Sequence, residues 1–280
     1  MAYNDYIERH KARHLRACQM KQLSILEEID RICVKHHIDY WLESGTLLGA
    51  IRHGGFIPWD DDIDVGMLEE DLERFKQVAP SELPHSMMLQ SPETVPESKE
   101  PIVKVRDNNS FYVEPGDDFS ADYPKGLFVD IFPFVPYPTV SRQFCKRFGR
   151  MYVRSRAILH KPHRYSLRSV AEFFWFGGQL VFSRIAWWLA SLFRGHDKYL
   201  SFVLKYNGYG VMHRRECVFP LGTVTFEGKS FPAPCDSDEY LRDLYHDYMQ
   251  VPPPNQRHIH SVFMLSQLEE EEDATDLPNQ

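Results

Sequence analysis

The stretch that decides the fold is residues 41–67, which read WLESGTLLGAIRHGGFIPWDDDIDVGM. It is entered through a short aromatic and β-branched run, residues 38–43, which is typical of a strand. Residues 44–46 predict a turn because they combine Ser, Gly and Thr, and residues 47–51 predict a short helix that runs away from it. Residues 62–67 then alternate acidic with apolar side chains, which indicates a second strand with one polar face.

Four carboxylates lie within residues 60–64. Because alternate residues of a strand point to one face, Asp62 and Asp64 should project together. Asp60 joins them if the strand starts early, whereas Asp61 points elsewhere. Mutual repulsion should raise the pKa of some of these carboxyl groups. Carboxylates that leave room for water and phosphate oxygens suit Mg²⁺ or Mn²⁺. The alternative is an ordinary solvated acidic loop.

A third acid, Asp130, stands in the otherwise apolar strand expected at residues 127–132. A lone carboxylate would be costly to bury there without a partner. A salt bridge or a backbone hydrogen bond would satisfy it, but a metal site shared with Asp62 and Asp64 explains its position better. Gly45-Thr46, at the start of a helix, can offer backbone N–H groups and a hydroxyl to a phosphate. Glu43 can either orient that turn or pair with Arg52.

Helical and strand patterns alternate outward from this centre, so the predicted fold class is α/β, more closely α+β. A mixed sheet is flanked by helices, with a helical insertion and a helical C-terminal part. The expected helices are residues 6–37, 69–78 and 236–249, the further strands are 102–106, 111–114 and 127–132, and residues 80–101 are expected to be loop.

Four regions follow from these patterns. Residues 1–140 are the expected catalytic core with its N-terminal helix, and residues 141–215 are a helical, aromatic-rich insertion. Residues 216–265 are a C-terminal part that packs on the core. Residues 266–280 form an acidic polar tail, which we expect to be disordered.

Composition narrows the class of protein. A formal net charge of −8 argues against non-specific nucleic-acid binding, which needs a broad basic surface. The five cysteines are odd in number and include no CxxC pair, which favours reduced thiols in the cytoplasm. The N-terminus has no apolar signal core, so no secretion signal is expected.

The most apolar stretch is residues 173–193, long enough for a span of ~20 residues. Arg184 lies near its middle, whereas Trp175, Trp187 and Trp188 suit a membrane interface. Three interpretations stand: a helix packed on the enzyme core, an interfacial helix at the inner face of the membrane that brings the enzyme to a lipid-linked glycan, and, least favoured, a true span. Peripheral membrane contact would then run through residues 170–195.

Residues 41–67 closely resemble the signature of the LicD family. That family includes bacterial phosphocholine transferases of surface glycans, is related to fukutin and fukutin-related protein, and belongs to the nucleotidyltransferase superfamily. Gly45-Thr46, Asp62-Ile63-Asp64 and Asp130 match the turn, the Asp-x-Asp strand and the third acid of the superfamily signature. Weaker likeness in later segments extends the resemblance over about residues 20–255.

The resemblance implies a nucleotidyltransferase-like mixed sheet and a metal-dependent phosphotransferase. Such an enzyme moves a phospho-alcohol, such as phosphocholine, from a CDP-linked donor (CDP-choline, CDP-ribitol) to a hydroxyl of a cell-surface glycan and releases CMP. The acceptor would be of the lipopolysaccharide, teichoic acid or capsule type. It implies Mg²⁺ or Mn²⁺ on Asp62, Asp64 and Asp130, with Asp60 auxiliary and Asp130 as ligand or base. The residues implied to contact the donor are Gly45, Thr46, Arg52, His53, Lys104 and Arg106. For Arg52 and His53, a structural role in the loop is the alternative.

The last two, Lys104 and Arg106, alternate with valines, so both can face one side of a strand toward an anionic donor; an ordinary solvated strand face is the alternative. Two rival functions stay open. One is nucleotidyl transfer onto a sugar, small molecule or protein, and the other is a non-catalytic glycan-binding protein. The intact Asp62, Asp64 and Asp130 set argues against a decayed site.

Overall fold

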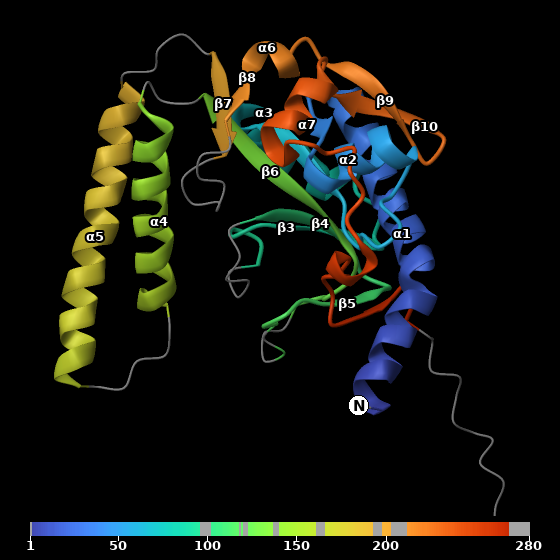
Figure 1. Ribbon diagram of the computed structural model, residues 1–280, viewed down its shortest axis with the longest axis horizontal. Helices are drawn as coiled ribbons and strands as arrows, with labels where there is room; N and C mark the ends of the chain where they lie inside the picture. The colour runs from blue at the N-terminus through green and yellow to red at the C-terminus, as the bar shows by residue number, and fades with distance from the viewer. Residues whose placement is uncertain are drawn as a thin grey trace, which may run out of the picture.

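The computed structural model describes residues 2–95, 102–117, 119, 123–136, 140–160, 166–192, 198–202 and 212–268. At its centre is a seven-stranded mixed sheet in the order β1-β2-β6-β4-β3, with β7 paired to β6 and β8 paired to β7 (Figure 1). Helices flank this sheet, so the α+β class is confirmed. The strands are β1 (Trp41–Leu42), β2 (Asp64–Leu68), β3 (Met87–Gln90), β4 (Val103–Asp107), β6 (Phe128–Pro136), β7 (Tyr199–Phe202) and β8 (His213–Arg214).

Strands β2 and β6 form the parallel pair of this sheet, and the other pairs are antiparallel. Both strands are buried and apolar along most of their length, as strands of a parallel pair usually are. Their register sets Asp64 opposite Asp130. Two acids that stand 66 positions apart in the sequence therefore become neighbours in the sheet.

The long helix α1 (Ala2–His36) confirms the helix expected over residues 6–37. Its apolar residues Cys18, Leu26, Ile29 and Cys33 recur at helical spacing and are buried. α1 contacts β4 and β6 and also α3 (Glu69–Glu82). Burial of each large apolar side chain of this kind contributes roughly 1.5–3 kcal/mol.

Two local predictions differ from the structure. The predicted turn at residues 44–46 is the first turn of α2 (Ser44–His53), because the Leu47 N–H donates to the Glu43 carbonyl oxygen across it. The predicted loop 80–101 contains β3, whose backbone groups pair with the edge of β4. Residues 96–101 of that loop lie outside the described residues.

The C-terminal part contacts several elements of the core. α7 (Ser237–Tyr245) packs on α2, β10 on β1, and β11 (Phe263–Leu265) on α1 and β5 (Phe111–Val113). α7 ends at Tyr245, earlier than expected, where His246 adopts φ 58°. The other elements of the C-terminal part are α6 (Arg215–Val218), the hairpin of β9 (Gly222–Phe226) and β10 (Lys229–Ala233), and the 3₁₀ turn η1 (Pro254–Gln256). The expected acidic tail falls mostly in residues 269–280, outside the described residues.

Helices α4 (Arg142–Leu159) and α5 (Leu167–Leu192) pack along each other and stand apart from the sheet (Figure 1). The first interpretation of the apolar stretch, a helix packed on the enzyme core, is therefore wrong. Among the described residues, no helix combines the length and apolarity needed to cross a membrane. The predicted insertion also contributes strands to the main sheet, because β7 and β8 lie within residues 141–215.

Candidate active site

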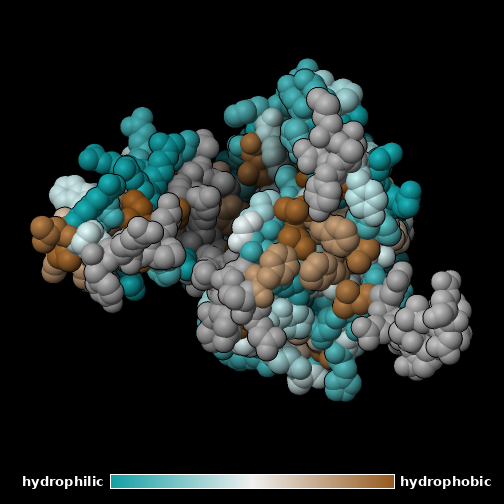
Figure 2. Space-filling model, turned by 90° about the horizontal axis from the view of Figure 1, so that it is seen from below, coloured by the Kyte–Doolittle hydropathy of each residue, from teal (hydrophilic) through white to brown (hydrophobic). Residues whose placement is uncertain are grey.

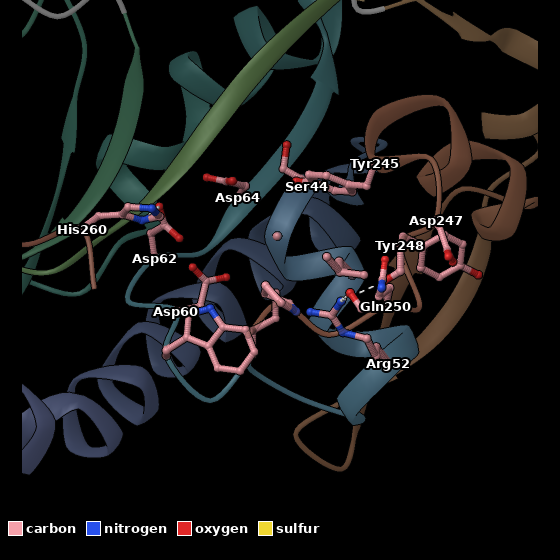
Figure 3. A pocket seen from close by; sticks show the side chains of 15 residues that line it. Ser44, Arg52, Asp60, Asp62, Asp64, Tyr245, Asp247, Tyr248, Gln250 and His260 are labelled. Carbon is pink, nitrogen blue, oxygen red and sulfur yellow. Dashed lines mark hydrogen bonds and ion pairs between the residues drawn. The ribbon is translucent and has the colours of Figure 1, made fainter. Parts of the chain in front are cut away.

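A cavity of about 520 Å³ opens where three segments meet: the start of α2, the loop of residues 60–63 before β2, called the acidic loop, and the C-terminal part (Figure 3). Its wall combines four aspartates with aromatic side chains and one arginine. The lining residues are Ser44, Gly45, Leu48, Arg52, Ile57, Trp59, Asp60, Asp62, Asp64, Tyr245, Asp247, Tyr248, Gln250, Pro252 and His260.

The carboxyl groups of Asp60, Asp62 and Asp64 point toward one space in this cavity (Figure 3). Asp64 is the first residue of β2, whereas Asp60 and Asp62 precede the strand in the loop. Burial, and then repulsion between neighbouring carboxylates, raises the pKa of all three, and a hydrogen bond links Asp60 with Asp62. Without a counter-ion, these groups therefore hold protons more tightly than exposed aspartates do.

Gly45 and Thr46 support the aspartates in different ways. A Cβ atom at Gly45 would lie 2.8 Å from Oδ2 of Asp60, so glycine leaves the space that this carboxylate occupies. The Thr46 hydroxyl accepts a hydrogen bond of 2.8 Å from the Asp64 N–H, which fixes the start of β2. Gly45 lines the cavity, but Thr46 does not.

Asp61 is fully buried and points away from the cavity, in the opposite sense to its two neighbours. Its carboxylate accepts hydrogen bonds from the Tyr112 hydroxyl (3.0 Å), the His260 N–H (2.9 Å) and the Ser261 N–H (2.7 Å). Asp60, Asp61 and His260 also bring three potential ligand atoms within 4.8 Å of one another. Because Asp61 already has three donors, we interpret it as a structural residue that ties the acidic loop to the C-terminal part.

Asp130 lies beside Asp64 and raises its pKa further, after burial and Asp62. However, Asp130 does not line the cavity, and the Lys104 ammonium lies 3.4 Å from its Oδ1 atom. The salt bridge considered as the alternative is thus present. A metal-ligand or base role for Asp130 stays a prediction.

Lys104 and Arg106 share one face of β4, as their alternation predicted, but that face is buried rather than solvated. Lys104 lies 3.0 Å from Glu114, and Arg106 donates to the Gly126 carbonyl oxygen at 2.7 Å. Both cations stand over the ring of Phe128, at 3.6 and 4.7 Å from its centroid. Neither residue lines the cavity, so their contact with a donor stays a prediction that the cavity wall does not support.

Arg52 and His53 are the last two residues of α2, and their side chains lie in different surroundings. Arg52 lines the cavity, and its guanidinium donates to the Tyr248 carbonyl oxygen at 2.7 Å. His53 is exposed and packs edge to face against Trp59, with 6.2 Å between ring centroids. Arg52 therefore both anchors the C-terminal part and offers positive charge at the cavity wall.

Glu43 lies fully buried beneath the first turn of α2. Its carboxylate accepts hydrogen bonds from Trp41 Nε1 at 3.1 Å and from the Tyr240 hydroxyl, not from an arginine. Burial raises the pKa of Glu43 to about 7. This network connects α7 to the segment that carries Ser44 and Gly45.

The C-terminal wall of the cavity was not predicted as part of the site. Tyr245 ends α7, Asp247 and Tyr248 follow it, and His260 precedes β11. Residues 245–249 fell within the weaker later likeness to the LicD family, which was the one signal available for them. No local pattern marks His260, which reaches Asp61 across 199 positions of sequence.

Residues 37–165 match the family model described as LicD/FKTN/FKRP, nucleotidyltransferase domain. The chain carries a domain of the LicD family. The matched interval contains the acidic run Asp60 to Asp64 and Asp130, but not Asp247.

Individual relatives of this LicD-family protein agree with that assignment. It is 29% identical to lipopolysaccharide cholinephosphotransferase LicD of Haemophilus influenzae, over 90% of this chain and 98% of that protein. It is 36% identical over 104 residues to human ribitol 5-phosphate transferase FKRP, covering 35% of this chain and 17% of FKRP. An uncharacterized protein of Rickettsia typhi is 42% identical over 74 residues, or 26% of this chain and 23% of that one. The chain thus spans nearly all of LicD but less than a quarter of the other two.

Proposed function

We propose that this LicD-family protein is a phosphotransferase that moves a phospho-alcohol from a CDP-linked donor to a hydroxyl of a glycan and releases CMP. The observation that carries the proposal is a cavity with three convergent aspartates inside the LicD-matched interval. Two relatives are named for transfer of a phosphorylated alcohol, phosphocholine in LicD and ribitol 5-phosphate in FKRP. Phosphocholine is the first phospho-alcohol to test because the likeness to LicD extends over nearly the full length of both chains.

The donor set of the cavity fits a hard divalent cation. Asp60, Asp62 and Asp64 present carboxylate oxygens to one space, and Gly45 keeps that space free of a side chain. The raised pKa of each carboxyl group indicates an excess of negative charge that a cation would neutralise. We infer that these three aspartates hold Mg²⁺ or Mn²⁺. When bound, such an ion lowers the pKa of the acceptor hydroxyl and neutralises charge on the donor phosphates.

The protein's own residues would bind and orient the two substrates. Arg52 offers a guanidinium to a phosphate oxygen, and Trp59, Tyr245 and Tyr248 give apolar surface that excludes water from the reacting groups. Held side by side, the acceptor and the donor react without the entropy cost of a chance encounter.

The transfer itself needs one bond to form and one to break. The acceptor oxygen bonds to the phosphorus that carries the alcohol, and the bond from that phosphorus to the CMP oxygen breaks. The proton of the acceptor hydroxyl passes to a carboxylate of the site. Asp130 is the base we favour, because the register places it beside Asp64.

The test is CMP release by the full chain from a panel of CDP-alcohols, with a glycan acceptor and Mg²⁺. We expect Asp62→Asn or Asp64→Asn to lower the rate by roughly 10³-fold or more, because each removes a charge needed at the reacting centre. Glu73→Gln, an exposed acid on α3, is the matched control and should keep the wild-type rate.

Two results would overturn the proposal. Wild-type CMP release by Asp64→Asn would refute the carboxylate assignment. Appearance of the nucleotide itself on the acceptor, followed with a label on the cytidine, would identify nucleotidyl transfer instead.

A further inference from the structure

The α4–α5 hairpin has an inverted pattern of polarity. The face of α5 that points away from α4 is apolar over the length of the helix and exposed, with Phe174 at 72%, Trp175 at 67% and Trp188 at 61%. Two of its polar residues turn inward instead, since Ser183 is buried and Gln179 accepts a hydrogen bond from Ser155 of α4. An ordinary surface helix has the reverse arrangement.

We call this apolar surface the outer face of α5. Its exposed members recur at steps of three, four and seven residues, so they form one continuous stripe. Figure 2 shows apolar side chains at the edge of the hairpin lobe that points away from the core. The outer face consists of Leu167, Val170, Phe174, Val181, Ile185, Trp188 and Leu192, flanked by Trp175, Phe182 and Leu189. A contiguous exposed apolar surface that runs the length of a helix indicates a binding partner.

The hairpin is also strongly basic in an acidic protein. Together, α4 and α5 carry eight Lys or Arg residues and one Glu, whereas the whole chain has a formal net charge of −8. Arg147, Arg150 and Arg154 are exposed on α4. Such a helix pair attracts an anionic surface, but it repels a second copy of itself.

We propose that the outer face of α5 docks this protein on an anionic lipid bilayer, with α5 lying in the plane of the interface. Aromatic residues with an apolar body and a polar edge, as in Trp175 and Trp188, favour that depth. By helical spacing, Arg168, Glu172 and Arg184 lie off the centre line of the stripe, which suits a helix lying along the surface. This inference goes beyond the proposed function and does not rest on it.

The test is flotation of the full chain with lipid vesicles, without any substrate. Vesicles of phosphatidylcholine mixed with phosphatidylglycerol should carry the protein upward, and vesicles of phosphatidylcholine alone should carry less. An outer-face variant with Phe174→Gln, Val181→Gln, Ile185→Gln and Trp188→Gln should bind the mixed vesicles more weakly, by roughly tenfold or more. Because these side chains are exposed, the variant should fold normally, which circular dichroism and gel filtration can check.

Two further variants separate the contributions. A control with four exposed apolar residues replaced elsewhere should float like the wild type: Met20→Gln, Val34→Gln, Val262→Gln and Leu268→Gln. Replacement of Arg147, Arg150 and Arg154 by Gln should lower binding to anionic vesicles by roughly tenfold or more and abolish the preference for them. Asp62→Asn should float normally, so failure of the enzymatic proposal would leave this one standing.

Three outcomes would overturn the inference. The first is that the wild type stays in the soluble fraction with both kinds of vesicle. The second is that the outer-face variant floats as well as the wild type. The third is a dimer in analytical ultracentrifugation that the outer-face substitutions dissociate, with no vesicle binding, which would assign the surface to a second copy.

Discussion

Substitution of Asp61 or Asp62 by alanine should have opposite consequences, although the two residues are adjacent. The Asp61 carboxylate is buried and accepts three hydrogen bonds, from Tyr112, His260 and Ser261. Asp62 lines the cavity among other carboxylates that repel it. We therefore expect Asp61→Ala to destabilise the fold and Asp62→Ala to remove function while leaving stability unchanged or higher.

The size of the Asp61 effect follows from its contacts. Each buried donor that loses its partner costs about 1–3 kcal/mol, and bonds to a charged acceptor lie toward the stronger end. With three donors affected and partial relaxation of the loop, we expect a loss of about 3–5 kcal/mol in the free energy of unfolding. At roughly 2–3 °C per kcal/mol for a domain of this size, Tm should fall by about 6–15 °C.

The assay is thermal and urea unfolding of both variants in EDTA, followed by circular dichroism. Equal Tm values for Asp61→Ala, Asp62→Ala and the wild type would refute the reasoning. A second readout is the rise in Tm on adding Mg²⁺. Loss of that rise in Asp61→Ala, with its retention in Asp62→Ala, would move the cation to the Asp60, Asp61 and His260 grouping.

Other expected outcomes concern protonation and space at the same site. The raised pKa of Glu43, about 7 against the usual 4.5, favours the protonated form in the folded state. The contribution of Glu43 to stability is therefore fully present below about pH 4.5 and is lost as pH rises through about 7. Between pH 5 and pH 8, the free energy of urea unfolding should fall by about 2–3 kcal/mol less in Glu43→Gln than in the wild type. Mg²⁺ should raise Tm more at pH 8 than at pH 5, because Asp62 and its neighbours must lose their protons to bind it, and an equal rise at both would contradict the raised pKa values. Gly45→Ala should weaken Mg²⁺ affinity by roughly tenfold, read by calorimetry, since its Cβ would meet the Asp60 carboxylate at 2.8 Å, whereas Gly177→Ala in α5 meets no atom and should change nothing.

Patterns that depend on neighbours in the sequence could be predicted, because the forces behind them are local. The spacing of apolar residues identified α1, the alternation of acidic with apolar residues located β2, and an apolar run with a single acid located β6. The turn at residues 44–46 was misassigned because Gly and Ser also begin helices, and the choice depended on the Leu47 N–H bond to Glu43.

Long-range contacts set the features that could not be predicted. Alternation correctly placed Lys104 and Arg106 on one face of β4, but whether that face meets a substrate or Glu114 depends on the segment that follows β5. The orientation of the apolar stripe of α5 could likewise not be predicted, because the stripe could have faced either the sheet or solvent. His260 reaches the acidic loop only through the fold.

The division of the cavity between two parts of the chain bears on what the family assignment can reveal. The three convergent aspartates Asp60, Asp62 and Asp64 lie in residues 37–165, the interval that matches the LicD family. Tyr245, Asp247 and Tyr248 lie outside it and build the opposite wall, whereas His260, also outside it, lies beside Asp62. The proposed metal-assisted chemistry would therefore use residues of the matched interval, whereas we expect recognition of the proposed alcohol to depend largely on the C-terminal residues of the cavity. Since Asp61 fastens His260 and Ser261 to the acidic loop, we expect a change at this buried carboxylate to affect both the stability of the loop and the shape of the cavity.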